Sequence, residues 1–195
     1  YIRDLAFQVA EIAASKENVR IQQRWRDVNA LRTPDRAPVW CRPVGAWNEI
    51  LPDEELFCAD PWLRSLETQF RRILIKNDIG DDSPVSQTYD VPAVFDVEPS
   101  NRWGVDVVHK STGEDGGSWR YDPQLKTEDD FERLMIPTFT YNASKTQEHL
   151  NRAHDLVGDL LPVRLECNPP LTATLGTPAA DLRGLTQMML DMVDN

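Results

Sequence analysis

The chain has 195 residues, enough to bury a core, and its 32 acidic and 21 basic residues give a net charge of −11. A field of that sign repels phosphate backbones and anionic lipid, so the composition argues against nucleic-acid and membrane partners. No window approaches the roughly 20 consecutive apolar residues of a membrane span, and three cysteines without a close pair predict a reducing, cytoplasmic location.

Two helices are predicted at the start of the chain. Apolar residues recur every three or four positions from Ile2 to Ile12, and the pattern resumes from Ile21 to Val28 after a polar turn. A short apolar run at residues 39–41, between prolines, then predicts a first strand.

The middle of the chain combines one helix with short β segments. Asp60 followed by Pro61 predicts the start of a helix that carries an apolar stripe to Leu74. Short strands are predicted at 90–99 and 103–111. Thr127 to Asp130 is the pattern of a helix cap, and we expect a short helix that runs to Leu134.

The last 52 residues predict a helix, a strand, a loop and a second helix. Ser144 and Gln147 form a capping pattern for a helix that ends at Gly158. The mostly apolar run Leu160 to Cys167 predicts a parallel-type strand covered on both faces by helices, although Arg164 and Glu166 within it indicate that one face or one end is polar. Thr177-Pro178 then predicts the start of one amphipathic helix that reaches Val193.

Most motifs for catalysis or metal binding are missing from the sequence. His149 and His154 are five residues apart, which places them on different faces of a helix, and neither HExxH nor CxxC occurs. We therefore predict no metal site in this chain. No GxSxG nucleophile motif is present, and the acidic pair Asp81-Asp82 is interpreted as a solvated turn.

Two polar residues follow apolar, strand-like runs. Arg42 comes after Pro-Val-Trp-Cys, and Asp96 ends the run Pro-Ala-Val-Phe. A guanidinium at the carboxyl end of a strand can grip a carboxylate with two hydrogen bonds. Polar residues at strand ends also serve turns, so a structural role for either residue stays open.

Three segments of the sequence resemble the uroporphyrinogen decarboxylase superfamily, which contains the tetrapyrrole decarboxylases and the corrinoid-linked methyltransferases. The first is DRAPVWCRPVGAW at 35–47, the second is PAVFDVEPSNRWGVDVV at 92–108, and the third is LLPVRLECNPPLTATLG at 160–176. They occur in the order of the family's motifs and span most of the chain.

The resemblance implies a (β/α)8 TIM barrel, with active-site groups at the carboxyl ends of its strands. The chain would be its N-terminal part, with extra N-terminal helices and the first strands in a single domain, 1–195. The start at Tyr1 and the unpartnered apolar stripe of the last helix suggest the same incompleteness.

The resemblance also assigns roles to individual residues. Arg42 matches an arginine that binds substrate carboxylate, while Ala46 stands where the decarboxylase has a second arginine. Asp96 matches the essential catalytic aspartate, with Glu98 as a rival for that position. Asn168 begins the loop that would border the substrate pocket.

Because the second arginine is missing, the first functional hypothesis is a corrinoid-linked methyltransferase-type enzyme with a small-molecule substrate. The alternatives are a decarboxylase of a tetrapyrrole or other polycarboxylate, and a non-catalytic binding protein on the same scaffold. The resemblance implies that any zinc site and contact with a corrinoid protein belong to the full-length protein, so this segment is expected to bind no cofactor. The sequence does not predict the oligomeric state.

Overall fold

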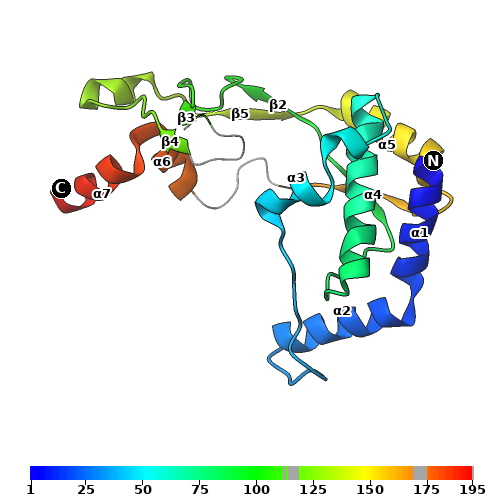
Figure 1. The fold of residues 1–195 in the computed structure, drawn as a ribbon. Coiled ribbons are helices and arrows are strands. Elements are labelled where there is room, and N and C mark those ends of the chain that lie inside the picture. The colour runs from blue at the N-terminus through cyan, green and yellow to red at the C-terminus, as the bar shows by residue number, and fades with distance from the viewer. Residues whose placement is uncertain (112, 114–118, 169–174, 195) are drawn as a thin grey trace. The chain divides into compact units, whose positions relative to one another are not determined.

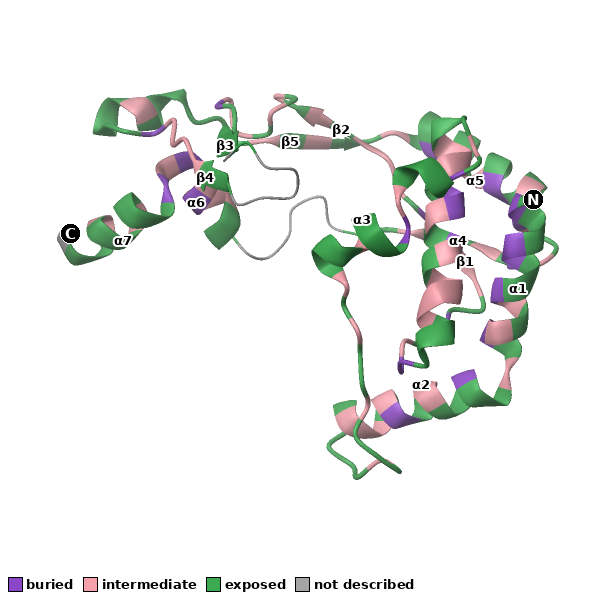
Figure 2. Cartoon of the chain, viewed as in Figure 1, coloured by how far each residue is buried: buried purple, intermediate pink, exposed green. Residues whose placement is uncertain are grey.

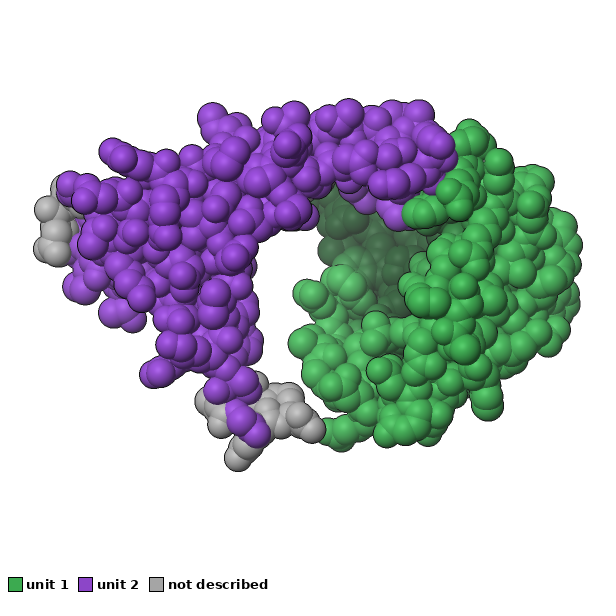
Figure 3. Space-filling model, turned by 90° about the horizontal axis from the view of Figure 1, so that it is seen from above, with its two compact units in different colours: residues 1–91, 147–166 green, residues 92–146, 167–195 purple. Residues whose placement is uncertain are grey.

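The computed structural model describes residues 1–111, 113, 119–168 and 175–194. The chain forms two compact units, which are coloured separately in Figure 3. Unit 1 comprises residues 1–91 and 147–166, and unit 2 comprises residues 92–146 and 167–195. Because each unit is described by itself, the prediction of a single domain stays a prediction.

The architecture is mixed α/β, with more helix than strand (Figure 1). The described strands form three separate two-stranded sheets, and they do not close into a barrel. The α/β class is thus confirmed at the coarse level, but the partial TIM barrel is not seen in the described part of the chain. None of its helices combines the length and apolarity that crossing a bilayer requires.

Unit 1 begins with the two predicted helices, α1 (Ile2–Ala14) and α2 (Lys16–Asn29). The chain turns between them at Ser15, whose backbone is extended and whose side chain accepts a hydrogen bond from the Asn18 amide at 3.1 Å. This is a standard N-cap, and it explains why one helix ends and the next begins without a loop. The apolar stripe of α1 is buried (Figure 2).

The longest helix of unit 1, α4 (Pro61–Ile79), has the predicted start. The Asp60 carboxylate accepts a hydrogen bond from the Leu63 amide at 2.9 Å, and proline follows the cap. Gly80 ends the helix with φ 76°, a left-handed conformation that glycine adopts without a steric penalty. This turn sends the next two residues back toward the helix bundle.

The core of unit 1 joins segments from both ends of the chain. The last part of α5 (Ala143–Val157) and the segment after it pack against α1 and α4. The buried cluster consists of Ile2, Leu5, Ala6, Val9, Ala13, Leu66, Phe70, Val85, Val157 and Leu161. α5 begins two residues earlier than predicted, because Asn142, and not Ser144, accepts the cap hydrogen bond, from the Lys145 amide at 3.0 Å.

One short sheet of unit 1 pairs β1 (Tyr89–Pro92) with β6 (Val163–Glu166). β6 confirms the strand predicted at 160–167, although it is shorter, and its parallel pairing stays a prediction. The expectation that helices cover both faces is wrong, because Leu165 is 43% exposed. Arg164 is also exposed and binds Asp90 of β1 through two hydrogen bonds of 2.8 Å.

The strand predicted at 39–41 does not form. These residues are irregular and precede η1 (Val44–Ala46), α3 (Trp47–Ile50) and η2 (Asp53–Glu55). The backbone donors that a strand would give to a sheet go instead to carboxylates, since the amides of Val39 and Cys41 donate to Asp82 and Asp81. Carboxylates therefore take most of the place of a β ladder, and one backbone hydrogen bond, from the Asp82 amide to the Val39 carbonyl at 2.7 Å, completes the contact.

Unit 2 contains two antiparallel sheets of two strands each. β2 (Phe95–Glu98) pairs with β5 (Thr138–Tyr141), and β3 (His109–Ser111) pairs with β4 (Trp119–Tyr121). The predicted cap at Thr127 is confirmed, and it starts a 3-10 helix, η3 (Glu128–Arg133). The buried cluster of this unit is small and consists of Val105, Leu125 and Leu182.

The helix predicted from Thr177 to Val193 is divided into α6 (Gly176–Arg183) and α7 (Leu185–Asp194). Gly184 lies between them with φ 83° and ψ 136°, which a helix cannot contain. As expected, part of the apolar stripe is exposed, including Met189 at 57% and Met192 at 69%.

Candidate functional site

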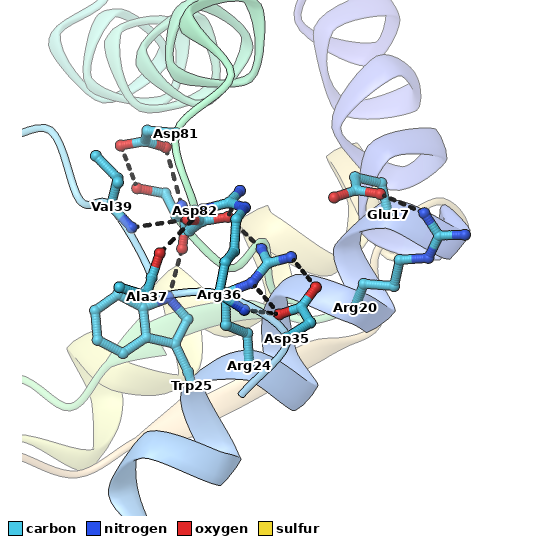
Figure 4. A network of polar contacts seen from close by, with 11 residues as sticks. Glu17, Arg20, Arg24, Trp25, Asp35, Arg36, Ala37, Val39, Asp81 and Asp82 are labelled. Atoms are coloured by element: carbon cyan, nitrogen blue, oxygen red, sulfur yellow. Dashed lines mark hydrogen bonds and ion pairs between the residues drawn. The ribbon is translucent and has the colours of Figure 1, made fainter. Parts of the chain in front are cut away.

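A buried carboxylate, Asp82, organises the polar side of unit 1 (Figure 4). Its side chain is 1% exposed and accepts two hydrogen bonds from the Arg36 guanidinium, at 2.6 and 2.7 Å. The Val39 amide donates a third at 2.7 Å, and Arg24 donates a fourth. Burial, the largest influence, opposes ionisation, but the hydrogen bonds and the two arginines outweigh it and lower the pKa of Asp82.

Arg24 links this carboxylate to a second one. Its guanidinium is 4% exposed and forms a bidentate pair with Asp35, with both N–O distances 2.7 Å. These hydrogen bonds lower the pKa of Asp35 to about 2, and hydrogen bonding to Asp35 in turn raises the pKa of Arg24. Two carboxylates therefore bind one buried guanidinium. Their negative charge compensates the positive charge of Arg24, which burial would otherwise leave unpaired.

Asp81 binds the same segment from its other side. Its carboxylate accepts hydrogen bonds from the Cys41 amide at 3.0 Å and the Ser83 amide at 2.9 Å, and Lys76 lies 3.0 Å away. Burial disfavours the charged form, yet these contacts together lower the pKa of Asp81. The interpretation of Asp81-Asp82 as a solvated turn was wrong, because both side chains are buried.

This network fixes the segment that carries Arg42. The backbone at Val39 and Cys41 is held on both sides of Trp40, whose ring is 56% exposed. The Arg42 guanidinium carbon lies 5.2 Å from the centre of that ring. A cation–π contact does not use the N–H donors of the guanidinium.

The backbone two residues after Arg42 is strained. Val44 has φ 44°, a left-handed conformation that a β-branched side chain disfavours. Such conformations cost on the order of 1–3 kcal/mol and concentrate at functional sites. The strain and the exposed guanidinium occur together, so the segment from Trp40 to Val44 is our candidate binding site.

Asp96 lies in unit 2, near the middle of β2, opposite Thr140 of β5. Its carboxylate accepts hydrogen bonds from the Lys145 ammonium at 3.0 Å and the Asn142 side-chain amide at 2.7 Å. These contacts, the Lys145 hydrogen bond first, lower its pKa, so Asp96 is ionised near neutral pH. An ionised carboxylate beside an ammonium can stabilise charge but is a poor proton donor.

The third predicted residue, Asn168, is exposed and follows β6, and the rest of its predicted loop, residues 169–174, lies outside the described residues. Arg42 belongs to unit 1, whereas Asp96 and Asn168 belong to unit 2. A site shared by the three residues therefore stays a prediction.

Metal ligands are not gathered in the described part of the chain, where no three His, Cys, Asp or Glu side chains are placed to share an ion. His149 and His154 are both exposed on α5. The Nε2 atom of His109 lies 2.9 Å from Asp181, and its ring stacks on Trp119 at 3.9 Å. The described residues thus do not fit a zinc centre.

Sequence reasoning missed the network that positions Arg42. Arg24, Asp35 and Asp82 are separated by up to 58 residues, so no local motif could reveal their contact. The available signal was an acidic pair directly after the glycine that ends a helix, in a chain whose arginines outnumber its lysines near the N-terminus.

No family model matches this sequence, and searches of curated proteins and of solved structures found no significant match.

Proposed function

We propose that the chain belongs to an enzyme of the uroporphyrinogen decarboxylase type and forms the N-terminal part of its (β/α)8 barrel. The proposal is supported by three sequence segments that resemble the family's motifs in the family's order, and by the mixed α/β architecture. The net charge of −11 and the three unpaired cysteines agree with a cytoplasmic enzyme that acts on a small molecule.

The main support for the proposal is the availability of the Arg42 side chain for a ligand. Its guanidinium makes no hydrogen bond or ion pair with a described residue, although the chain has an excess of carboxylates. A planar guanidinium binds a carboxylate with two parallel hydrogen bonds. In the proposed enzyme Arg42 holds a carboxylate of the substrate, and the buried network beneath it keeps the guanidinium in place.

Asp96 supplies negative charge in this proposal. Its lowered pKa keeps it ionised at neutral pH, so it can stabilise a positive charge that develops on the substrate. The Lys145 and Asn142 contacts fix the orientation of the carboxylate before the substrate binds. Asn168 would contribute a side-chain amide at the edge of the pocket.

The reaction we favour is methyl transfer with a corrinoid protein as partner, because Ala46 replaces the second carboxylate-binding arginine of the decarboxylase. Decarboxylation of a tetrapyrrole or another polycarboxylate is the second candidate, and the unpaired Arg42 is the observation that favours it. The resemblance assigns any zinc ligands to later segments of the barrel. A binding protein without catalysis is the third hypothesis.

The complete protein tests the proposal through two assays with Arg42→Lys and Asp96→Asn. Demethylation of methylcobalamin, followed by absorbance, reports methyl transfer, and release of carbon dioxide from uroporphyrinogen reports decarboxylation. We expect activity in the first assay. Arg42→Lys should raise KM about tenfold or more, since an ammonium cannot make the two-pronged contact, and Asp96→Asn should lower kcat with little change in stability.

Arg26→Lys is the matched control, because Arg26 is an arginine of the same unit that binds only Gln22. It should leave both kinetic constants unchanged. Full activity of both site variants would remove Arg42 and Asp96 from the site. Inactivity of the complete protein in both assays would favour the binding protein.

A further inference from the structure

Unit 2 contains an apolar groove that its small core leaves open. The groove has a volume of about 330 Å³ and is lined by residues of η3, α6 and α7. Most of the lining side chains are apolar, among them Trp103, Phe131, Leu134, Leu182 and Met188. Aromatic rings offer a large apolar area and methionine offers an adaptable shape, so such a lining suits an apolar partner.

The two charged residues of the groove, Arg183 and Asp191, neutralise each other. Arg183 donates two hydrogen bonds to the Asp191 carboxylate, at 2.6 and 2.9 Å. It also donates to the backbone carbonyls of Leu125 and Lys126, each at 2.9 Å. An anionic ligand would have to displace Asp191 to reach this guanidinium, so the groove does not select for anions.

The surface beside the groove is acidic. Glu128, Asp129 and Glu132 are exposed on η3, the element that contributes Phe131 to the groove. Their carboxylates form no hydrogen bond or ion pair with another described residue, whereas Asp130 pairs with Arg133 at 3.1 Å. The pKa of Arg183 is raised, chiefly by its hydrogen bonds to Asp191 and further by the charges of Asp130 and Glu128, so the acidic residues of η3 act on the groove itself.

The apolar surface continues from the groove along α7. Met188 lines the groove, and Leu185 and Met192, three residues before it and four after it, share its helix face. Both are exposed, at 48% and 69%, and much of α7 is exposed in Figure 2. A helix of ten residues is about 15 Å long. This surface is therefore longer than a small ligand needs, and it suits a helix laid along the groove.

We propose that the groove binds a basic amphipathic helix of a partner protein. The apolar face of that helix packs against the groove and α7, and its lysine or arginine side chains lie over the carboxylates of η3. Charge complementarity selects this partner, because the unpaired charges beside the groove are all negative.

A second copy of the chain is a poorer occupant, since it has the same acidic residues and a net charge of −11. The inference goes beyond the proposed function and does not depend on it. Neither Arg42, Asp96 nor Asn168 lines the groove.

The test measures binding of two synthetic peptides to the complete protein by fluorescence anisotropy. The first is a helix of about 14 residues made of leucine and lysine, with the leucines at helical spacing. The second has glutamate in place of lysine, so only its charge differs. We expect the lysine peptide to bind at least about tenfold more tightly at low salt, and the difference to shrink as salt is added.

Phe131→Ala tests whether the lysine peptide occupies the groove. It removes an exposed aromatic wall and should weaken binding about tenfold, as truncation of an aromatic anchor does. Phe57→Ala is the matched control, because Phe57 is an exposed phenylalanine of unit 1, and it should leave binding unchanged. Both side chains are exposed, so circular dichroism of the two variants should match that of the original protein.

A second pair of variants tests the acidic surface. Conversion of all three unpaired η3 carboxylates to amides should weaken binding of the lysine peptide about tenfold at low salt. These changes are Glu128→Gln, Asp129→Asn and Glu132→Gln. The control removes the same charge from exposed positions of unit 1, with the changes Glu11→Gln, Glu49→Gln and Glu54→Gln. It should bind the peptide far better than the η3 variant, because only the location of the lost charges differs.

Four results would overturn the inference. The first is no binding of the lysine peptide, and the second is equal binding by Phe131→Ala and the original protein. Self-association that Phe131→Ala abolishes, without peptide binding, would assign the groove to a second copy. Binding to the 195-residue chain but not to the complete protein would mean that a later segment of the same polypeptide covers the groove.

Discussion

The two units differ in how many apolar residues they bury and in whether they bury paired charges. Unit 1 buries a cluster of ten apolar residues, and it also buries an ionic network whose donors and acceptors are paired. Unit 2 buries a cluster of only three, and its sheets are short antiparallel pairs. Since buried apolar area is the main source of stability, unit 1 should be the more stable of the two.

Unit 2 also leaves an apolar groove open. The groove has a volume of about 330 Å³ and is lined by side chains that include Trp103, Phe131 and Met188. Its rim carries Arg183, which forms two hydrogen bonds with Asp191 at 2.6 and 2.9 Å. The buried charges therefore lie in unit 1, where they hold the segment that carries Arg42. They do not lie beside the incompletely covered apolar surface of unit 2.

The largest effect should come from Asp82→Ala. Removing this carboxylate leaves two guanidiniums without their shared partner, one of them buried, and breaking a buried ion pair costs about 3–5 kcal/mol. We expect urea unfolding to show that loss, and hydrogen exchange to show weaker protection in unit 1 than in the original chain. Exchange in unit 2 should be unchanged.

Asp159→Ala is the control for this change, because Asp159 forms an exposed pair with Arg3 at 2.7 Å. Its effect should be far smaller, since solvent screens an exposed pair. Equal effects of the two variants would mean that burial of the network contributes nothing to unit 1.

Replacing one buried leucine in each unit compares how much the two cores contribute to the free energy of unfolding. Leu66 in unit 1 is 2% exposed and Leu125 in unit 2 is 3% exposed. Leu66→Ala should cost roughly 3–5 kcal/mol, because the packed cluster around it cannot collapse, whereas Leu125→Ala should cost nearer 2 kcal/mol, because it borders an open groove. Denaturant titration with hydrogen exchange assigns each loss to its unit, and a larger loss at Leu125 would reverse the comparison.

Acid should destabilise unit 1 through the carboxylates of its ionic network. The folded-state pKa is about 2 for Asp35 and is lowered for Asp82, whereas an unfolded aspartate titrates near 3.9. A lowered pKa stabilises the fold above the unfolded value, and that contribution is lost as the pH falls through the folded value. Urea titrations should therefore give a constant free energy of unfolding from about pH 7 to 5 and a decline from about pH 4 to 2.

The control for the acid experiment is Asp82→Asn, which lacks one of these carboxylates and should show a shallower decline. A decline as steep as in the original chain would mean that other groups cause the acid sensitivity.

The elements that sequence reasoning predicted well have a local cause. The stripes of α1, α2 and α4, the caps at Asp60 and Thr127, and the stop at Gly80 depend on residues within one or two helical turns. The predicted strand at 39–41 did not form because its amides donate to the side-chain carboxylates of Asp81 and Asp82. These acceptors lie about 40 residues later, so the local sequence does not reveal them.

The candidate site was predictable only in part. Arg42 could be selected because it follows an apolar run and matches a family segment, but its stacking on Trp40 required the structure. The division of the last helix at Gly184 shows that a single glycine can override a continuous apolar stripe.

The core of unit 1 also has a consequence for synthesis of the protein. Helix α1 provides half of the residues in that cluster, yet its partners Val157 and Leu161 are translated about 150 residues later. At 5–20 residues per second, the ribosome needs on the order of ten seconds to deliver them. During that interval the apolar face of α1 has only α4 and the segment around Val85 to cover it, so the nascent chain presents a binding site for chaperones that the finished protein no longer has.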